Sequence, residues 1–244
     1  MRGNVLAPLL RRRHEAAERT HGILINDDTA FAIKEAYKTA RTNLLFALAT
    51  SENKCVIMTS ALAAEGKSTN CANLALTMSQ TGASVLLIDA DLRKSTQHKI
   101  FGISNTIGLA EILGGFCKVG DGVHEQVHLN LDIITAGQVP PNPSELLGSQ
   151  NMQKLIEIVS KNYNYIFIDS PPVNIVTDAL VLARYAAGLI VCTRHRQSTH
   201  DELRRAIASI EFANAKILGL VVCDVKDANG SYYRKSYKSY KSYE

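Results

Sequence analysis

The chain has 244 residues, of which 46% are hydrophobic, 20% are charged and 6% are aromatic. Its 27 Lys and Arg residues against 23 Asp and Glu residues leave a formal net charge of +4, which excludes a strongly basic nucleic-acid binder and an acidic disordered chain. Apolar runs stay well short of the roughly 18 residues that a membrane helix needs, and the basic run 11–13 follows the first apolar segment, the reverse of a secretory signal. These features predict a cytoplasmic globular protein without a nucleic-acid partner.

The N-terminal region divides into two segments. Residues 1–27 are polar, basic and weakly patterned, and we expect them to be flexible. Residues 28–50 repeat apolar side chains at helical spacing, which predicts a helix that Asp28 or Thr29 caps.

From residue 55 onward, short apolar runs alternate with helix-length segments. The runs are rich in Val, Ile and Leu with little polar alternation, as in strands that are buried on both faces of a sheet. This alternation predicts a doubly wound α/β domain over 28–226, with a mostly parallel sheet and helices on both faces. The expected strands are 55–60, 84–89, 131–135, 165–169, 188–193 and 218–224, and the expected helices are 68–80, 143–161, 174–186 and 201–213.

The C-terminal segment has a different composition. Residues 230–244 repeat Ser, Tyr and Lys and contain no aliphatic side chain, so we expect the tail 227–244 to be disordered. The five cysteines are odd in number and never spaced as CxxC, which predicts free thiols and no cysteine metal site.

A phosphate-binding loop follows the first predicted strand. Residues 61–69 read Ala-Leu-Ala-Ala-Glu-Gly-Lys-Ser-Thr, close to the P-loop NTPase pattern G-x-x-x-x-G-K-[ST], with Ala61 in place of the first glycine. In that pattern the backbone N–H groups cradle phosphates, Lys67 reaches the β- and γ-phosphates, and Ser68 offers a hydroxyl to Mg²⁺. The residues expected to bind the nucleotide are Ala64, Glu65, Gly66, Lys67, Ser68 and Thr69.

Three aspartates stand at the ends of predicted strands. Asp89 and Asp91 follow the run 85–88, and Asp169 follows four apolar residues in the pattern of a Walker B acid. Ligands of α/β sheets bind at the carboxyl ends of the strands, so we expect these aspartates and the phosphate loop to form one site. The expected ligands are ATP and Mg²⁺.

Further segments carry a resemblance to a known family. Residues 87–93, Leu-Ile-Asp-Ala-Asp-Leu-Arg, look like its Walker A′ motif, and residues 140–147, Pro-Pro-Asn-Pro-Ser-Glu-Leu-Leu, match a very specific segment. Glu35, Lys38 and Arg41 are similar to its E-x-x-R-x-x-R oligomerisation motif, with Lys38 where Arg is usual. The stretch 99–114 and the tyrosine-rich tail also match. From about residue 30 to the end, the chain resembles the bacterial protein-tyrosine kinases, the autokinases of capsule and exopolysaccharide synthesis.

The resemblance implies an ATP-dependent protein-tyrosine kinase. By similarity, Lys67 binds phosphates, while Ser68, Asp91 and Asp169 hold Mg²⁺. Asp89 takes the proton of the tyrosine hydroxyl, although the spacing leaves open whether Asp89 or Asp91 is the base. The catalytic candidates are Lys67, Asp89 and Asp91. The implied acceptors, phosphorylated in trans, are the tail tyrosines Tyr232, Tyr233, Tyr237, Tyr240 and Tyr243.

The resemblance also implies partners. They are a membrane-anchored activator that regulates chain length in polysaccharide export, other proteins phosphorylated on tyrosine, and a phosphotyrosine phosphatase. A homo-oligomeric ring would form through Glu35, Lys38 and Arg41. We expect the activator to hold the chain at the inner face of the cell membrane.

Two other functions stay open. The first is a partition or positioning ATPase without kinase activity; its signature lysine would fall at Leu62, and the absence of that lysine argues against it. The second is a non-catalytic nucleotide-sensing scaffold, which Ala63 and Ala64 favour because the kinase family has Pro and Gly there. Arg194, His195 and Arg196 either line the nucleotide site or belong to a solvated loop.

Overall fold

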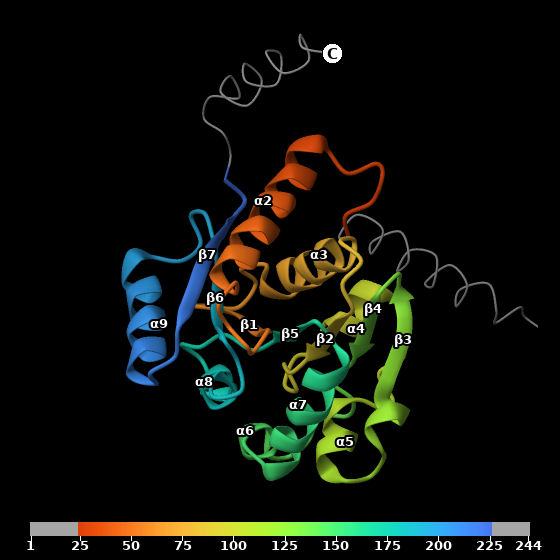
Figure 1. Cartoon of the computed structure of the whole chain (residues 1–244). Coiled ribbons are helices and arrows are strands. Elements are labelled where there is room, and N and C mark those ends of the chain that lie inside the picture. The colour runs from red at the N-terminus through yellow and green to blue at the C-terminus, as the bar shows by residue number, and fades with distance from the viewer. Residues whose placement is uncertain (1–23, 226–244) are drawn as a thin grey trace, which may run out of the picture.

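The computed structural model describes residues 24–225, so the tail tyrosines and most of the segment 1–27 lie outside the described residues. A central sheet has the strand order β3-β4-β2-β5-β1-β6-β7 (Figure 1). Neighbouring strands pair in parallel except for β3 and β4, which pair antiparallel. The strands are β1 (Cys55–Ser60), β2 (Val85–Asp89), β3 (Val123–His128), β4 (Leu131–Ile134), β5 (Tyr165–Asp169), β6 (Gly188–Arg194) and β7 (Ile217–Cys223).

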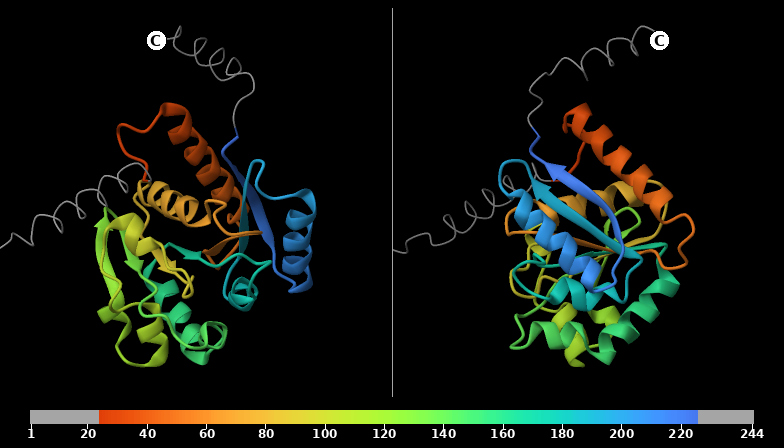
Figure 2. Two further views of the ribbon diagram at one scale, coloured as in Figure 1. Left: turned by 180° about the vertical axis from the view of Figure 1, so that it is seen from behind. Right: turned by 90° about the vertical axis from the view of Figure 1, so that its left-hand side faces the viewer.

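Helices cover both faces of the sheet, which confirms the predicted doubly wound α/β fold (Figure 2). On one face pack α2 (Phe31–Ala47), α3 (Lys67–Ser79) and α4 (Gln97–Phe101). On the other face pack α5 (Leu109–Gly114), α6 (Pro143–Leu147), α7 (Gln150–Asn162), α8 (Asp178–Ala183) and α9 (His200–Phe212), together with the 3-10 turn η1 (Val119–Gly122).

Two hydrophobic cores flank the sheet because successive side chains of a strand point to opposite faces. In β1, Ile57 packs into the core beneath α5 to α9, whereas Val56 and Met58 pack into the core beneath α2 to α4. All three side chains are at most 1% exposed. Burial on both sides explains why the strand sequences are continuous apolar runs.

The structure corrects several predicted elements. The helix predicted over 143–161 is two helices, α6 and α7, separated at Gly148 and Ser149; the Ser149 hydroxyl accepts the N–H of Met152 at 3.3 Å and caps α7. The helix predicted over 174–186 is only α8, since residues 173–175 and 184–185 form turns. The residue that precedes α2 is Ala30 and makes no side-chain cap, so the expected cap by Asp28 or Thr29 is wrong.

The sequence patterns also missed β3, α4 and α5. Strand β3 is an edge strand whose side chains are half-buried or exposed, so it has no apolar run. All five cysteines are free, as expected. Within residues 24–225, no helix combines the length and the apolar character needed to cross a bilayer.

Candidate functional site

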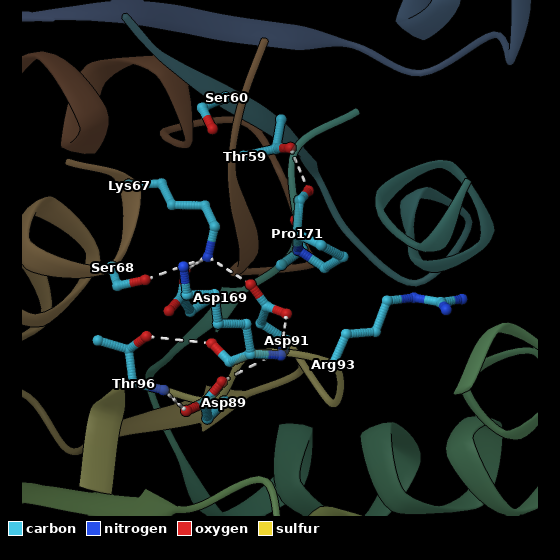
Figure 3. Close-up of polar contacts among 12 residues, drawn as sticks. Thr59, Ser60, Lys67, Ser68, Asp89, Asp91, Arg93, Thr96, Asp169 and Pro171 are labelled. Carbon is cyan, nitrogen blue, oxygen red and sulfur yellow. Dashed lines mark hydrogen bonds and ion pairs between the residues drawn. The ribbon is translucent and has the colours of Figure 1, made fainter. Parts of the chain in front are cut away.

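The sheet brings the predicted acidic residues together. Strands β2 and β5 are neighbours, and their register places Asp89 directly beside Asp169. Strand β1 lies next to β5, so the loop between β1 and α3 starts at the same carboxyl edge. Lys67 begins α3 and therefore points its side chain toward the ends of β2 and β5 (Figure 3).

Lys67 is the cation at the centre of this cluster. Its Nζ lies 2.9 Å from Asp91 Oδ2 and 3.3 Å from Asp169 Oδ1. It also lies 3.1 Å from the hydroxyl of Ser68. Burial by itself lowers the pKa of the Lys67 ammonium, but the charges of Asp169 and Asp91 outweigh it and raise the pKa above its ordinary value. Lys67 therefore stays protonated.

Asp89 lies behind this cluster and is fully buried. Its Oδ2 accepts the backbone N–H groups of Thr96 and Gln97, both at 2.9 Å, and its Oδ1 accepts the N–H of Asp91 at 3.2 Å. Burial, followed by the charge of Asp169, raises the pKa of Asp89 to about 7. Asp89 therefore fixes the segment 91–97 and titrates near neutral pH.

Gln97 is a residue of the site that the sequence interpretation missed. It is fully buried at the start of α4, and its Nε2 donates to Asp169 Oδ2 at 2.8 Å and to the carbonyl of Ser68 at 3.1 Å. Its Oε1 is buried and has no hydrogen-bond partner within residues 24–225. The one sequence signal for Gln97 is its position, six residues after Asp91.

Glu65 has a role that differs from the expected one. Its side chain is fully buried. One carboxylate oxygen accepts the N–H of Leu62 at 2.7 Å. The other accepts the N–H of Arg194 at 3.3 Å and the hydroxyls of Thr193 and Ser198. The carboxylate of Glu65 thus ties the loop to the segment 193–198.

Two residues of the loop adopt left-handed backbone angles. Gly66 has φ +85°, and a Cβ there would meet Asn70 Nδ2 at 3.1 Å and Cys223 Sγ at 3.3 Å. Ala64 has φ 64°. Glycine adopts such angles without the steric cost that a Cβ causes, so the alanine at position 64 strains the loop.

A cavity of about 410 Å³ opens between the loop and the acidic residues. Of the predicted nucleotide and metal residues, Ala64, Gly66, Lys67, Ser68, Thr69 and Asp91 line it. Asp89, Glu65 and Asp169 are not among its lining residues. A second cavity of about 310 Å³ adjoins it and lies against α2 and β7. Arg194 lines both cavities, whereas His195 and Arg196 line neither of them.

Arg93 joins the site to the Pro-Pro-Asn-Pro-Ser segment. Its Nε donates to Asp178 Oδ2 at 3.0 Å, and its Nη2 donates to Asp178 Oδ1 at 3.2 Å and to the hydroxyl of Ser144 at 2.9 Å. Asp178 is fully buried and also accepts the Ser144 hydroxyl. The two hydrogen bonds from the Arg93 guanidinium to the Asp178 carboxylate hold the guanidinium beside the cavity.

The predicted oligomerisation residues lie together on α2. Lys38 Nζ is 2.7 Å from Glu35 Oε1 on the helix surface. Arg41 instead turns inward, and its Nη1 donates to the carbonyl of Thr77 at 3.0 Å. The single chain therefore already uses Arg41 to hold α2 against α3.

The donor set of the site fits Mg²⁺ bound together with phosphates. Within residues 24–225 there is no group of three or more His, Cys, Asp or Glu side chains placed to hold a metal ion. Mg²⁺ in nucleotide sites uses one or two carboxylates, waters and phosphate oxygens. The site offers oxygen groups that can bind Mg²⁺ directly or through water. They are the Ser68 hydroxyl, the Asp91 carboxylate and the buried Gln97 Oε1, which has no hydrogen-bond partner within residues 24–225.

Comparison with known proteins agrees with this geometry. Residues 53–217 match the AAA domain family. The chain is 36% identical over 212 residues to the putative tyrosine-protein kinase CapB of Staphylococcus aureus, covering 86% of this chain and 93% of that protein. It is 34% identical over 222 residues to the tyrosine-protein kinase YwqD of Bacillus subtilis, covering 91% and 94%. It matches 31% of the length of the tyrosine-protein kinase Wzc of Salmonella typhimurium, at 35% identity.

Solved structures give the same result. The kinase domain of the Escherichia coli tyrosine kinase ETK superposes with a TM-score of 0.74 at 34% identity, covering 80% of this chain and 78% of that one. The septum site-determining protein MinD of Pyrococcus horikoshii, at 22% identity and a TM-score of 0.60 over 71% and 72% of the chains, shares the fold. The loop, the acids and the sheet define a P-loop nucleotide-binding enzyme. The chain belongs to the bacterial tyrosine-protein kinase family and is a tyrosine-protein kinase.

Proposed function

We propose that this kinase phosphorylates its own tail tyrosines in trans and thereby regulates capsule or exopolysaccharide synthesis and export. The observation that carries the proposal is the cluster of Lys67, Asp91 and Asp169, of which Lys67 and Asp91 line a cavity that the phosphate loop borders. A tyrosine kinase needs this arrangement, because it must hold a γ-phosphate, neutralise its charge and place a phenol in line with it.

Each residue of the cluster has a proposed task. Lys67 and the backbone N–H groups of 64–69 bind the phosphates, and the N-terminus of α3 adds its partial positive charge. Ser68, Asp91 and Asp169 hold Mg²⁺, largely through water, and Gln97 orients Asp169. Bound Mg²⁺ supplies neutralising charge on the transferred phosphoryl group.

Two aspartates are candidates for the base, on different grounds. Asp89 has a pKa of about 7, which suits a group that accepts a proton near neutral pH. Asp91 lines the cavity, whereas both oxygens of Asp89 already accept backbone N–H groups. The pH dependence of kcat/KM decides between them: Asp89→Asn removes an activity increase near pH 7 only if Asp89 is the base.

The tail and the assembly complete the proposal. The five tail tyrosines lie among Arg234, Lys235, Lys238 and Lys241, so several phosphates would reverse the charge of the tail. We assign residues 28–226 to the kinase domain, 1–27 to a basic N-terminal segment and 227–244 to the acceptor tail. A ring through Glu35, Lys38 and Arg41 would bring each tail to a neighbouring site.

A membrane-anchored activator, a phosphotyrosine phosphatase and other tyrosine substrates are the proposed partners. The match covers 93% of the CapB chain but 31% of Wzc, so relatives occur both as kinase-sized chains and within longer ones. We place the proposed activator on a separate polypeptide that holds the kinase at the cytoplasmic face of the membrane.

Intact-mass measurement tests the acceptor assignment. Wild type incubated with Mg-ATP and, where needed, an activator gains phosphates. The variant with phenylalanine at all five tail positions gains none but still phosphorylates an added tyrosine peptide, and Lys67→Ala does neither. A gain of mass that survives the five substitutions places the acceptors elsewhere. Hydrolysis of ATP without tyrosine phosphorylation of any protein would favour the alternative function of a positioning ATPase.

A further inference from the structure

The cavity of about 410 Å³ has two chemically different sides. Lys67, Ser68, Thr69 and Asp91 make one side polar. The other side consists of Pro171, Pro172, Ile175 and Val176, which we call the apolar wall. In Figure 3, Lys67 and Pro171 lie on opposite sides of Asp91. A site for phosphates alone has no use for such a wall, because phosphates gain from cations and N–H donors.

The apolar wall is held firmly to the sheet. The Thr59 hydroxyl donates to the carbonyl of Pro171 at 2.8 Å, and the N–H of Val173 donates to the carbonyl of Ser60 at 2.9 Å. The N–H groups of Ile175 and Val176 donate to the carbonyl of Pro172 at 3.1 and 3.2 Å and close a turn. The wall therefore has a fixed position relative to β1 and the phosphate loop.

Ile175 is the exposed part of this wall. Its side chain is 58% exposed, although large aliphatic residues gain from burial. The rest of residues 24–225 leaves more than half of this side chain uncovered, and Ile175 lines a cavity that Asp91 also lines. A ligand that fits both features has an apolar body and a polar tip.

We propose that the apolar wall is the binding site for the ring of the acceptor tyrosine. The ring packs on Ile175, Val176 and the two prolines, and the phenolic hydroxyl points toward Asp91 and the transferred phosphoryl group. A tyrosine side chain has the required apolar body and polar tip. This inference rests on the phosphoryl-transfer role proposed for the site, but it does not require the acceptor to be a tail tyrosine.

Steady-state kinetics of the full chain test the wall. The acceptor is a synthetic peptide with one tyrosine and flanking residues unlike those of the tail, at saturating Mg-ATP. Ile175→Ser raises the KM for the peptide by roughly fivefold or more, because the ring loses apolar contact. The affinity for ATP stays within about twofold, and Ile175→Leu restores the KM.

A matched control is Ile158→Ser on α7, where an isoleucine that is 46% exposed lies outside the cavity. It leaves the KM unchanged. An unchanged KM in Ile175→Ser, or an equal loss of ATP affinity, overturns the inference, as does a wild type that phosphorylates no tyrosine peptide. If wild type phosphorylates the peptide but not its own tail, the tail assignment fails, and the KM of Ile175→Ser still decides the role of the wall.

Discussion

Lys67 Nζ lies 2.9 Å from Asp91 Oδ2, so the lysine that is expected to bind phosphates is paired with a carboxylate of its own site. A phosphate ligand therefore has to share or displace this pairing. The same ammonium lies 3.3 Å from the fully buried Asp169. Lys67 is consequently expected to contribute to the stability of the chain as well as to the proposed binding of phosphates.

Replacing Lys67 with methionine removes the cation from two buried carboxylates. Unpaired buried charges cost several kcal/mol, so we expect Lys67→Met to lose about 3 kcal/mol in the free energy of unfolding at pH 8 without nucleotide. Adding Asp91→Asn recovers part of the loss. Urea unfolding measures both variants, with Lys94→Met, an exposed lysine at the same cavity, as the neutral control. Equal stability of Lys67→Met and Lys94→Met would contradict the structural role of the pairing.

The raised pKa of Asp89 predicts a pH dependence of stability. A carboxyl whose pKa rises from 3.8 to about 7 on folding holds its proton more tightly in the folded state. Its contribution to stability is therefore fully present below pH 3.8 and is lost as the pH rises to about 7. Relative to Asp89→Asn, the free energy of unfolding of wild type falls across this range and is level above it. Parallel curves for the two proteins would show that Asp89 has an ordinary pKa.

The left-handed backbone at Ala64 predicts that glycine stabilises the loop. Ala64→Gly removes the Cβ strain at φ 64°, and because the side chain is exposed, it loses no packing. We expect the free energy of unfolding to rise by about 1 kcal/mol and the ATP affinity to rise with it. Ala63→Gly, which changes an exposed neighbour, is the control and gives no gain. A loss of stability in Ala64→Gly would mean that chain entropy outweighs the strain.

The contacts of Glu65 predict that it is energetically coupled to Ser198. In Glu65→Gln, an NH₂ group replaces one of the two carboxylate oxygens, so some of the groups that donate to Glu65 lose their acceptor. Ser198→Ala removes one of these donors. We expect the two losses of stability to fall short of additivity by about 1 kcal/mol, measured in a double-mutant cycle. Ser209→Ala, a remote serine on α9 that donates to the carbonyl of Arg205, adds independently to Glu65→Gln. If the double mutant loses the sum of the two single losses in the free energy of unfolding, Glu65 and Ser198 are not coupled.

The elements that the sequence predicted best are those whose side chains are buried on both faces. The runs that became β1, β2 and β5 each carry four consecutive apolar or aromatic residues, at 55–58, 85–88 and 165–168, and this signal does not depend on the rest of the fold. Strand β3 gave no such signal, because it pairs only at an edge and a register shift interrupts its pairing with β4. Helices α4 and α5 are too short for a helical period to show.

The site divides in the same way. Lys67 and Asp169 were predictable because a motif places each at the end of a strand or the start of a helix. The contacts of Gln97 and Glu65 were not predictable, because their partners are distant in sequence. Asp169 lies 72 residues from Gln97, and Thr193 lies 128 residues from Glu65. The inward turn of Arg41 likewise depends on the packing of α2 on α3.

Asp89 and Asp169 are paired in register on β2 and β5. The backbone hydrogen bonds between these two strands therefore fix the distance between the strands at the site. We therefore expect the amides of these strands to exchange with deuterium among the slowest in the chain, with or without nucleotide. The loop 61–66 and the segment 91–97 are outside the ladder and can change protection when a ligand binds. The carboxylates of Asp89 and Asp169 thus sit on a rigid frame, and selection can alter the surrounding loops without moving it.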